Sequence, residues 1–205
     1  SSWVELLSSR EKPDRKKAFQ DLAAFLEKFV DTYFKTCRDA VKKYAPNNLY
    51  LGCRINTGNW RLSNAATRYC DIVSCNSYNF LPVTSYVTNQ KDKPIIVGEF
   101  HFGAMDRGLL HPGTMSVSSQ KQRGRAYIQY IQHLLEDPMV VGAHWFQFSD
   151  ESVAGRFDGA NKQIGFIDIC DNPYHETINA SRVCGDSLYD YRTESRPNNL
   201  EEKVD

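Results

Sequence analysis

The amino-acid sequence predicts an α/β fold built on a parallel sheet, because helical and strand-like segments alternate along the chain. Two segments, 18–44 and 118–136, repeat apolar residues every three or four positions, which indicates amphipathic helices. Four other segments are apolar runs of the kind that parallel sheets bury on both faces: 49–55, 71–78, 94–103 and 140–150. At 205 residues, the chain is long enough for one domain with a sizeable core.

The chain begins with a long helix and a strand. A charged run over 10–17 is interpreted as the solvated start of the helix over 18–44, which ends at Pro46. The strand over 49–55 follows and carries Arg54 near its end. A polar group at the end of a buried strand is the first sign of a site at one edge of the sheet.

The middle of the chain repeats this pattern. A short helix or turn over 61–69 leads to the strand over 71–78, whose last residues are polar. The strand over 94–103 follows and meets an ionisable residue at Glu99. The glycine-bearing loop over 103–116 is long for a connection to a helix, so it is a candidate substrate loop.

The last third of the chain begins with the helix over 118–136, which Ser118 or Ser119 can cap. The fourth strand, 140–150, ends in polar groups and leads into a loop rich in Gly and Asp. A short helix over 174–183 is expected to close the main unit.

The amino-acid composition predicts where the domain ends. Residues 1–191 are predicted to form one domain, and 192–205 are predicted to be a disordered polar tail, because they offer almost nothing to bury.

The composition argues for a neutral partner. Lys and Arg together number 25, as do Asp and Glu, so no net charge recruits nucleic acid or an anionic membrane. No apolar run reaches the length of a membrane span, and the first residues lack the pattern of a signal peptide. The compartment stays undetermined. The six cysteines have no metal-ligand spacing, so reduced thiols, no zinc and no cofactor are expected.

Glu99 stands where a catalytic group belongs in a (β/α) barrel, at the carboxyl end of a buried strand. A structural ion pair at the rim is the alternative. Four parallel strands are too few for a closed barrel and leave two bare edges. The residues alone therefore predict either a small open α/β sheet or half of a barrel.

Three motifs in order resemble the C-terminal half of clan-A glycoside hydrolases, most closely the β-agarases of family 50, with the family 42 β-galactosidases as relatives. They are Ile-Val-Gly-Glu-Phe around Glu99, Asn-Ser-Tyr at 76–78, and His-Trp-Phe-Gln-Phe at 144–148 with the segment Gly-Arg-Phe-Asp-Gly-Ala-Asn-Lys-Gln-Ile-Gly-Phe at 155–166. The resemblance covers most of the chain, from the first helix to about Arg182.

The resemblance implies a TIM-barrel fold of which this chain holds strands five to eight, a half-barrel. It implies that Glu99 is the nucleophile of a retaining mechanism and that the acid/base Glu ends strand four, which would precede Ser1 and is not in this chain. Asp150 and Glu151 are the other carboxylates at a strand's active end, and such residues more often cap loops.

Further site residues follow from the resemblance and from strand alternation. Tyr78 is expected to donate its hydroxyl to Glu99. Trp145 is expected to form a flat floor under the sugar, with Gln147 on the same face to bind hydroxyl groups and His144 packed under a helix. As alternatives, Tyr78 and Trp145 are aromatic residues that only fill the core.

Three polar residues complete the predicted substrate-binding set. His101 shares strand parity with Glu99 and is either a substrate-binding or a satisfied structural histidine. Arg54 and Asn76 lie at strand ends, where each is expected to bind hydroxyl groups or to orient Glu99; a structural ion pair is the alternative for Arg54.

The predicted function is that of a retaining glycoside hydrolase acting on a galactose-containing polysaccharide. Because the acid/base residue is missing, the isolated chain is expected to be weak or inactive. The alternative is a non-catalytic carbohydrate-binding or assembly fragment that pairs with itself or with a missing N-terminal half. A Ser-His-Asp hydrolase is disfavoured, because no G-x-S-x-G motif follows any strand.

Overall fold

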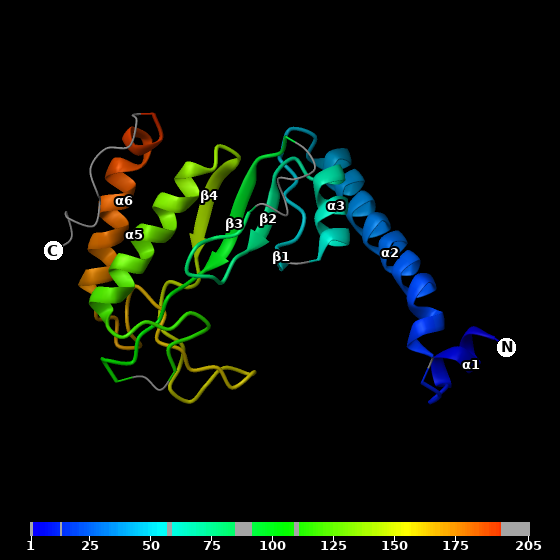
Figure 1. Cartoon of the computed structure of the whole chain (residues 1–205), viewed down its shortest axis with the longest axis horizontal. Coiled ribbons are helices and arrows are strands. Elements are labelled where there is room, and N and C mark those ends of the chain that lie inside the picture. The colour runs from blue at the N-terminus through cyan, green and yellow to red at the C-terminus, as the bar shows by residue number, and fades with distance from the viewer. Residues whose placement is uncertain (1, 13, 57–58, 85–91, 109–110, 194–205) are drawn as a thin grey trace.

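A parallel four-stranded sheet forms the centre of the molecule, as the sequence predicts (Figure 1). The computed structural model describes residues 2–12, 14–56, 59–84, 92–108 and 111–193. The strands lie in chain order and every neighbouring pair is parallel. They are β1 (Ile55–Asn56), β2 (Val73–Asn76), β3 (Ile95–Phe100) and β4 (Val140–Trp145). Within the described ranges β1 and β4 are the edges of this sheet.

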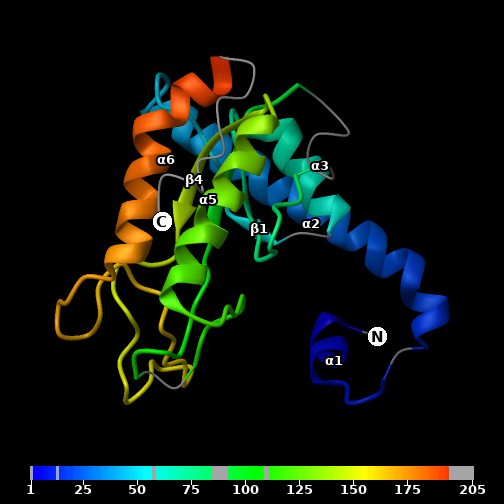
Figure 2. The ribbon, with the colours of Figure 1, turned by 60° about the vertical axis from the view of Figure 1, so that its left-hand side comes forward.

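Helices flank both ends of the sheet. Figure 1 shows α2 (Arg15–Tyr44) and α3 (Trp60–Tyr69) beside β1, and α5 (Gln120–Glu136) and α6 (His175–Thr193) beside β4. The short helix α1 (Trp3–Ser8) lies beyond the N-terminal end of α2 and apart from the sheet (Figures 1 and 2). No helix among the described residues is long and apolar enough to span a membrane.

The hydrophobic core lies between the sheet and these helices. Ile95, Val97 and Phe100 of β3 are buried in it, and they pack with residues of α2, α3, α5 and α6. Ser119 accepts a hydrogen bond from the Gln122 amide and caps α5, so it is the second of the two predicted caps that forms.

The strands are shorter than the sequence predicts. The apolar run over 49–55 gives only the two strand residues of β1, because Gly52 takes a left-handed φ of +69° and interrupts the extended chain. A Cβ at Gly52 would lie 2.6 Å from the Cys70 Sγ, so the close approach requires glycine. The run over 140–150 likewise leaves the sheet after Trp145.

The last helix is longer than predicted and includes Arg192 and Thr193, the first residues of the predicted tail. The Arg192 guanidinium donates to the Val140 and Asp137 carbonyl oxygens at 2.8 and 2.7 Å, which ties the end of α6 to the start of β4. Composition alone does not reveal this long-range contact. The rest of the predicted tail, 194–205, lies outside the described residues.

The first half of α2 carries an apolar face that the described residues leave uncovered. Phe19, Leu22 and Phe29 are more than half exposed, although they belong to the periodic stripe that predicts this helix. The second half of α2 packs normally, with Phe34 almost fully buried. The apolar stripe of α2 is therefore buried in its second half and exposed in its first half.

Candidate active site

Glu99 lies at the carboxyl end of β3 and is held by two side chains. Its Oε1 is 2.7 Å from Nη1 of Arg54, and its Oε2 accepts a hydrogen bond of 2.7 Å from the Tyr78 hydroxyl. The Glu99 side chain is 15% exposed, so it is mostly but not fully buried. The hydrogen bond from Tyr78 is the contact that the resemblance implies.

Tyr78 is a permanent hydrogen-bond donor at this site. Burial raises its pKa far above the ordinary value, and the hydrogen bond to the Glu99 carboxylate raises the pKa further. The Tyr78 hydroxyl therefore keeps its proton at neutral pH and donates a hydrogen bond to Glu99.

Gly98 makes room for Arg54 to reach Glu99. A Cβ at position 98 would lie 2.5 Å from the Arg54 Cδ and 2.8 Å from the Ser74 Oγ, so a larger residue would displace the arginine. Arg54 itself is about half exposed, so its ion pair with Glu99 is partly screened by solvent. The pair orients the carboxylate more than it stabilises the fold.

His101 is a buried structural histidine in this structure and has no ring nitrogen free for a sugar. The Thr114 amide donates to its Nε2 at 2.8 Å, which leaves the proton on Nδ1, 3.1 Å from the Phe146 carbonyl oxygen. Burial and the nearby charge of Lys162 lower its pKa to about 4, so the imidazole is neutral. These contacts are those of a satisfied structural histidine, which was the alternative to a substrate-binding role for His101.

The ring of His101 nevertheless supports the site. Its centroid lies 4.8 Å from the centroid of the Tyr78 ring, and Tyr78 is the residue that donates a hydrogen bond to Glu99. His101 thus joins the end of β3, the start of the loop after β4 and the backbone at Thr114 behind the candidate nucleophile.

Trp145 packs toward the helices, which differs from the sugar floor that the sequence predicts. Its Nε1 donates to the Ile164 carbonyl oxygen at 2.8 Å, and its ring meets Phe100 edge-on at 5.2 Å. His144, predicted to lie under a helix, is exposed instead. The physical reason is the strand register, which pairs Trp145 with the buried Phe100.

Asn76 and Gln147 keep polar groups near the end of the sheet. Asn76 pairs in register with Glu99, and its Oδ1 is buried without a hydrogen-bond partner among the described residues. Gln147 is partly buried and its Nε2 donates to the Ser149 carbonyl oxygen at 3.1 Å. Its other amide atoms remain available to a ligand.

The two carboxylates after β4 hold the following loop in place. Asp150 accepts from the Gly165 amide at 2.7 Å and from the Tyr174 hydroxyl at 2.6 Å, and burial raises its pKa. The Glu151 carboxylate is fully buried and accepts from the Lys162 amide at 2.9 Å. Both carboxylates thus hydrogen-bond the backbone of the following loop, which is the behaviour that the loop-capping alternative describes.

Arg123 is a buried anchor that sequence reasoning missed. Its guanidinium donates to the Phe102 and Gly165 carbonyl oxygens at 2.9 and 2.7 Å, so it joins the loop after β3 to the loop after β4. Burial lowers its pKa to about 10, and the group stays charged at neutral pH. An arginine within the polar first turns of a helix gives no local sign of such a role.

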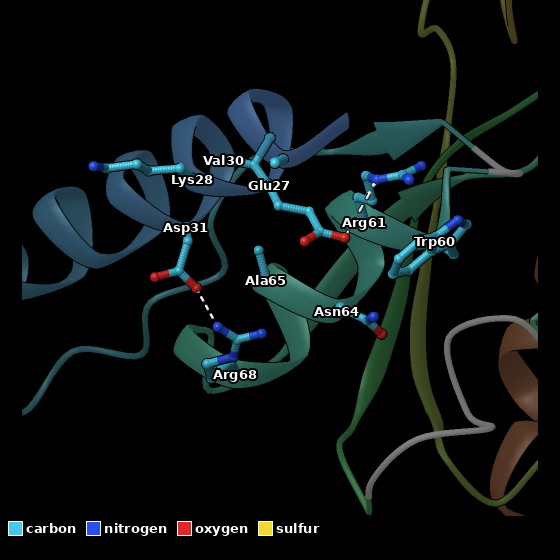
Figure 3. Close-up of a pocket in the computed structure, with 10 residues that line it drawn as sticks. Glu27, Lys28, Val30, Asp31, Trp60, Arg61, Asn64, Ala65 and Arg68 are labelled. Carbon is cyan, nitrogen blue, oxygen red and sulfur yellow. Dashed lines mark hydrogen bonds and ion pairs between the residues drawn. The ribbon is translucent and has the colours of Figure 1, made fainter. Parts of the chain in front are cut away.

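A pocket of about 530 Å³ lies between α2 and α3, and none of the residues that hold Glu99 line it (Figure 3). Two ion pairs join charged side chains across the pocket, Asp31 with Arg68 and Glu27 with Arg61. Within the part of the chain that the structure describes, no group of three or more His, Cys, Asp or Glu side chains is placed to hold a metal ion.

Comparisons with known proteins identify relatives of this chain. No protein-family model matches it. β-Agarase B of Vibrio sp. (strain JT0107) is 37% identical over 200 residues, which cover 92% of this chain and 21% of the relative. β-Agarase A of the same strain is 33% identical over 181 residues, which cover 82% of this chain and 18% of the relative. The chain thus spans about a fifth of the length of these relatives.

Solved structures give the same result. The agarase AgWH50C has a TM-score of 0.81 and 38% identity, and the match covers 95% of this chain and 28% of that one. An exo-β-agarase has a TM-score of 0.80 and 39% identity, with 88% and 25% covered. PfGH50B has a TM-score of 0.80 and 36% identity, with 86% and 26% covered. Over most of its own length, the chain is therefore homologous to one part of the β-agarases of glycoside hydrolase family 50, which supports that family.

Proposed function

We propose that this chain carries the nucleophile of a retaining glycoside hydrolase that acts on agar or a similar galactose-containing polysaccharide. The observation that carries the proposal is the Glu99 carboxylate at the end of β3, held by Arg54 and Tyr78 at 2.7 Å each. The names of its relatives, β-agarases A and B, support the substrate class.

In the proposed reaction, a Glu99 carboxylate oxygen attacks the anomeric carbon and forms a glycosyl ester as the bond to the leaving oxygen breaks. An acid group protonates that oxygen, and water later cleaves the ester and regenerates the carboxylate. Tyr78 and Arg54 hold the carboxylate for attack. Asn76 and Gln147 are proposed to bind sugar hydroxyl groups, while Trp145 and His101 support the site from behind.

The proton donor is proposed to lie on another polypeptide segment. Retaining hydrolysis needs a second carboxyl about 5–5.5 Å from the nucleophile. Asp150 and Glu151, the carboxylates nearest the end of β4, are instead committed to the loop after it. We therefore expect the isolated chain to bind sugar and accept a reactive glycoside, but to turn over natural substrate weakly or not at all.

The fold proposed for the complete site is a clan-A (β/α)₈ barrel in which β1 to β4 are strands five to eight and 1–191 form the C-terminal half. The open edges at β1 and β4 and the uncovered apolar face of α2 support this proposal. A complementary segment with four strands would pair with both edges and cover that face.

Intact-mass spectrometry after incubation with a 2-fluoro galactoside bearing a dinitrophenyl leaving group tests the proposed nucleophile. That leaving group departs without acid assistance, so the reaction needs only the carboxylate and a formed sugar site. One adduct that maps to Glu99 and is absent from Glu99→Gln is expected. Folded protein that forms no adduct, or forms it on another residue, would refute the proposed role.

A further inference from the structure

The loop after β4 contains a tight turn that backbone hydrogen bonds and an ion pair stabilise. The Arg156 amide donates to the Ala160 carbonyl oxygen and the Gly159 amide donates to the Arg156 carbonyl oxygen, both at 2.9 Å. The Arg156 side chain donates twice to the Asp158 carboxylate, at 2.6 and 3.3 Å. This contact lowers the pKa of Asp158 to about 2, so the carboxylate is ionised at neutral pH.

Phe157 lies at the tip of this turn and is 100% exposed. A fully exposed phenyl ring is unfavourable in water and gains free energy when an apolar surface covers it. Single exposed apolar residues are common on protein surfaces, so exposure alone assigns no role. The neighbouring Arg156, however, contacts both an aromatic ring near the Glu99 site and a buried carboxylate.

The Arg156 guanidinium lies between two aromatic rings. It is 6.0 Å from the centroid of Phe146, at the end of β4, and 5.8 Å from that of Phe157. Phe146 in turn lies beside His101, with ring centroids 6.2 Å apart. Pairwise contacts thus link His101, behind Glu99, to Phe146, Phe146 to Arg156, and Arg156 to Phe157 at the tip of the turn.

A buried carboxylate fixes the other side of the guanidinium. Oε1 of Glu151 lies 3.3 Å from Nη1 of Arg156 and has no hydrogen-bond partner among the described residues. The Glu151 side chain has no exposed surface, so the arginine compensates a buried charge. This ion pair ties the Arg156 guanidinium to a buried residue at the start of the loop.

The turn also belongs to the edge of the sheet where Glu99 lies. In Figure 1 the loop after β4 lies beyond the carboxyl ends of the strands. The Glu99 charge contributes to raising the pKa of Arg156, after the larger effects of Asp158 and Glu151, so the two groups are within electrostatic range. The ring contacts of His101 with Phe146 and with Tyr78 likewise connect the Arg156 turn to the Glu99 site.

We propose that Arg156 and Phe157 form a sugar-binding subsite beside the Glu99 site, which contacts a neutral galactose-containing oligosaccharide away from the bond that is cleaved. The Phe157 ring stacks against the C–H face of a sugar, and the Arg156 N–H groups that Asp158 and Glu151 leave unused donate to its hydroxyl groups. This subsite rests on the proposed function.

Isothermal titration calorimetry of the full chain with an agar-derived hexasaccharide and disaccharide tests the subsite. Phe157→Ala is expected to weaken hexasaccharide binding roughly tenfold and to change disaccharide binding little, because only the longer ligand reaches the turn. Since Phe157 is fully exposed, the variant should unfold at the wild-type temperature. Tyr189→Ala, which removes a 77% exposed ring on α6, is the matched control and should bind as the wild type does.

The outcomes separate the subsite from the proposed function. Equal hexasaccharide affinity in wild type and Phe157→Ala, with the galactosyl adduct still forming on Glu99, would overturn the subsite and leave the function standing. A wild-type chain that binds neither agar-derived ligand and forms no adduct would overturn both. A glucose-based hexasaccharide that binds as tightly as the agar-derived one would overturn the assigned ligand class.

Discussion

The hydroxyl of Tyr78 and the carboxylate of Glu99 form a 2.7 Å hydrogen bond between the segment after β2 and the end of β3. The two residues are 21 positions apart in the sequence, and the parallel pairing of their strands brings them together. Because Tyr78 keeps its proton, this bond fixes one carboxylate oxygen and leaves the other to the partly exposed Arg54.

Tyr78→Phe removes this hydrogen bond while keeping the ring that packs on His101. The rate at which the 2-fluoro galactoside labels Glu99 is expected to fall roughly tenfold to a hundredfold, because a hydrogen bond to a charged group is worth about 1.5–3 kcal/mol. The labelling rate by mass spectrometry is the measurement. A wild-type rate in a folded variant would contradict the positioning role of Tyr78.

Gly98→Ala is expected to displace Arg54 from Glu99, because the added Cβ would occupy the space of the Arg54 Cδ. Arg54→Met removes the same ion pair directly. If both act on one contact, the double variant should label no more slowly than the slower single variant. Independent effects that add would show that Gly98 acts through something other than Arg54.

His101 predicts a pH dependence of stability. Its pKa of about 4 in the folded protein lies below the ordinary histidine value of 6.5, so the unfolded chain binds more protons than the folded protein as pH falls. The contribution of this group to stability is therefore complete above pH 6.5 and is lost as pH falls toward 4.

Urea unfolding at pH 7 and pH 5 measures this effect. The wild type is expected to lose roughly 2 kcal/mol from this group between the two pH values, and His101→Gln should lose that much less. His133→Gln, at a side chain that is 44% exposed, is the control and should retain the wild-type slope. Identical pH slopes for His101→Gln and the wild type would contradict the assigned neutral, buried state.

Arg123→Met is expected to destabilise the fold by more than about 3 kcal/mol, because it leaves buried carbonyl oxygens without donors. Urea unfolding measures the change. Gln122→Met, at an exposed position on the same helix, is the control and should change stability by about 0.5 kcal/mol or less. A loss below about 1 kcal/mol for Arg123→Met would show that water replaces the guanidinium.

The apolar face of α2 predicts association. Light scattering is expected to detect self-association of the chain or its pairing with an added N-terminal segment of a related agarase. Phe25→Glu combined with Phe29→Glu should reduce it, because both rings are at least 60% exposed. A strictly monomeric wild type that also ignores the added segment would contradict the proposed barrel closure.

Part of the candidate site could be predicted from local sequence patterns. Glu99 and Tyr78 follow buried strands whose apolar pattern is continuous, so their place at one edge of a parallel sheet follows from the alternation of elements. The Asp150 and Glu151 loop contacts agree with the ordinary behaviour of acidic residues after a strand. Arg123 was missed, since its partners lie 21 and 42 positions away.

The sequence by itself determined the parallel α/β sheet and the position of Glu99 at its carboxyl edge, because helix and strand periods are local properties. Only the tertiary structure decided which face Trp145 occupies and whether His101 has a free nitrogen. The reason is the register: between Val97 and Phe100, β3 advances three residues while β4 advances from Ala143 to Trp145. That irregularity breaks the simple alternation of faces, and parity counted along a single strand does not carry across it.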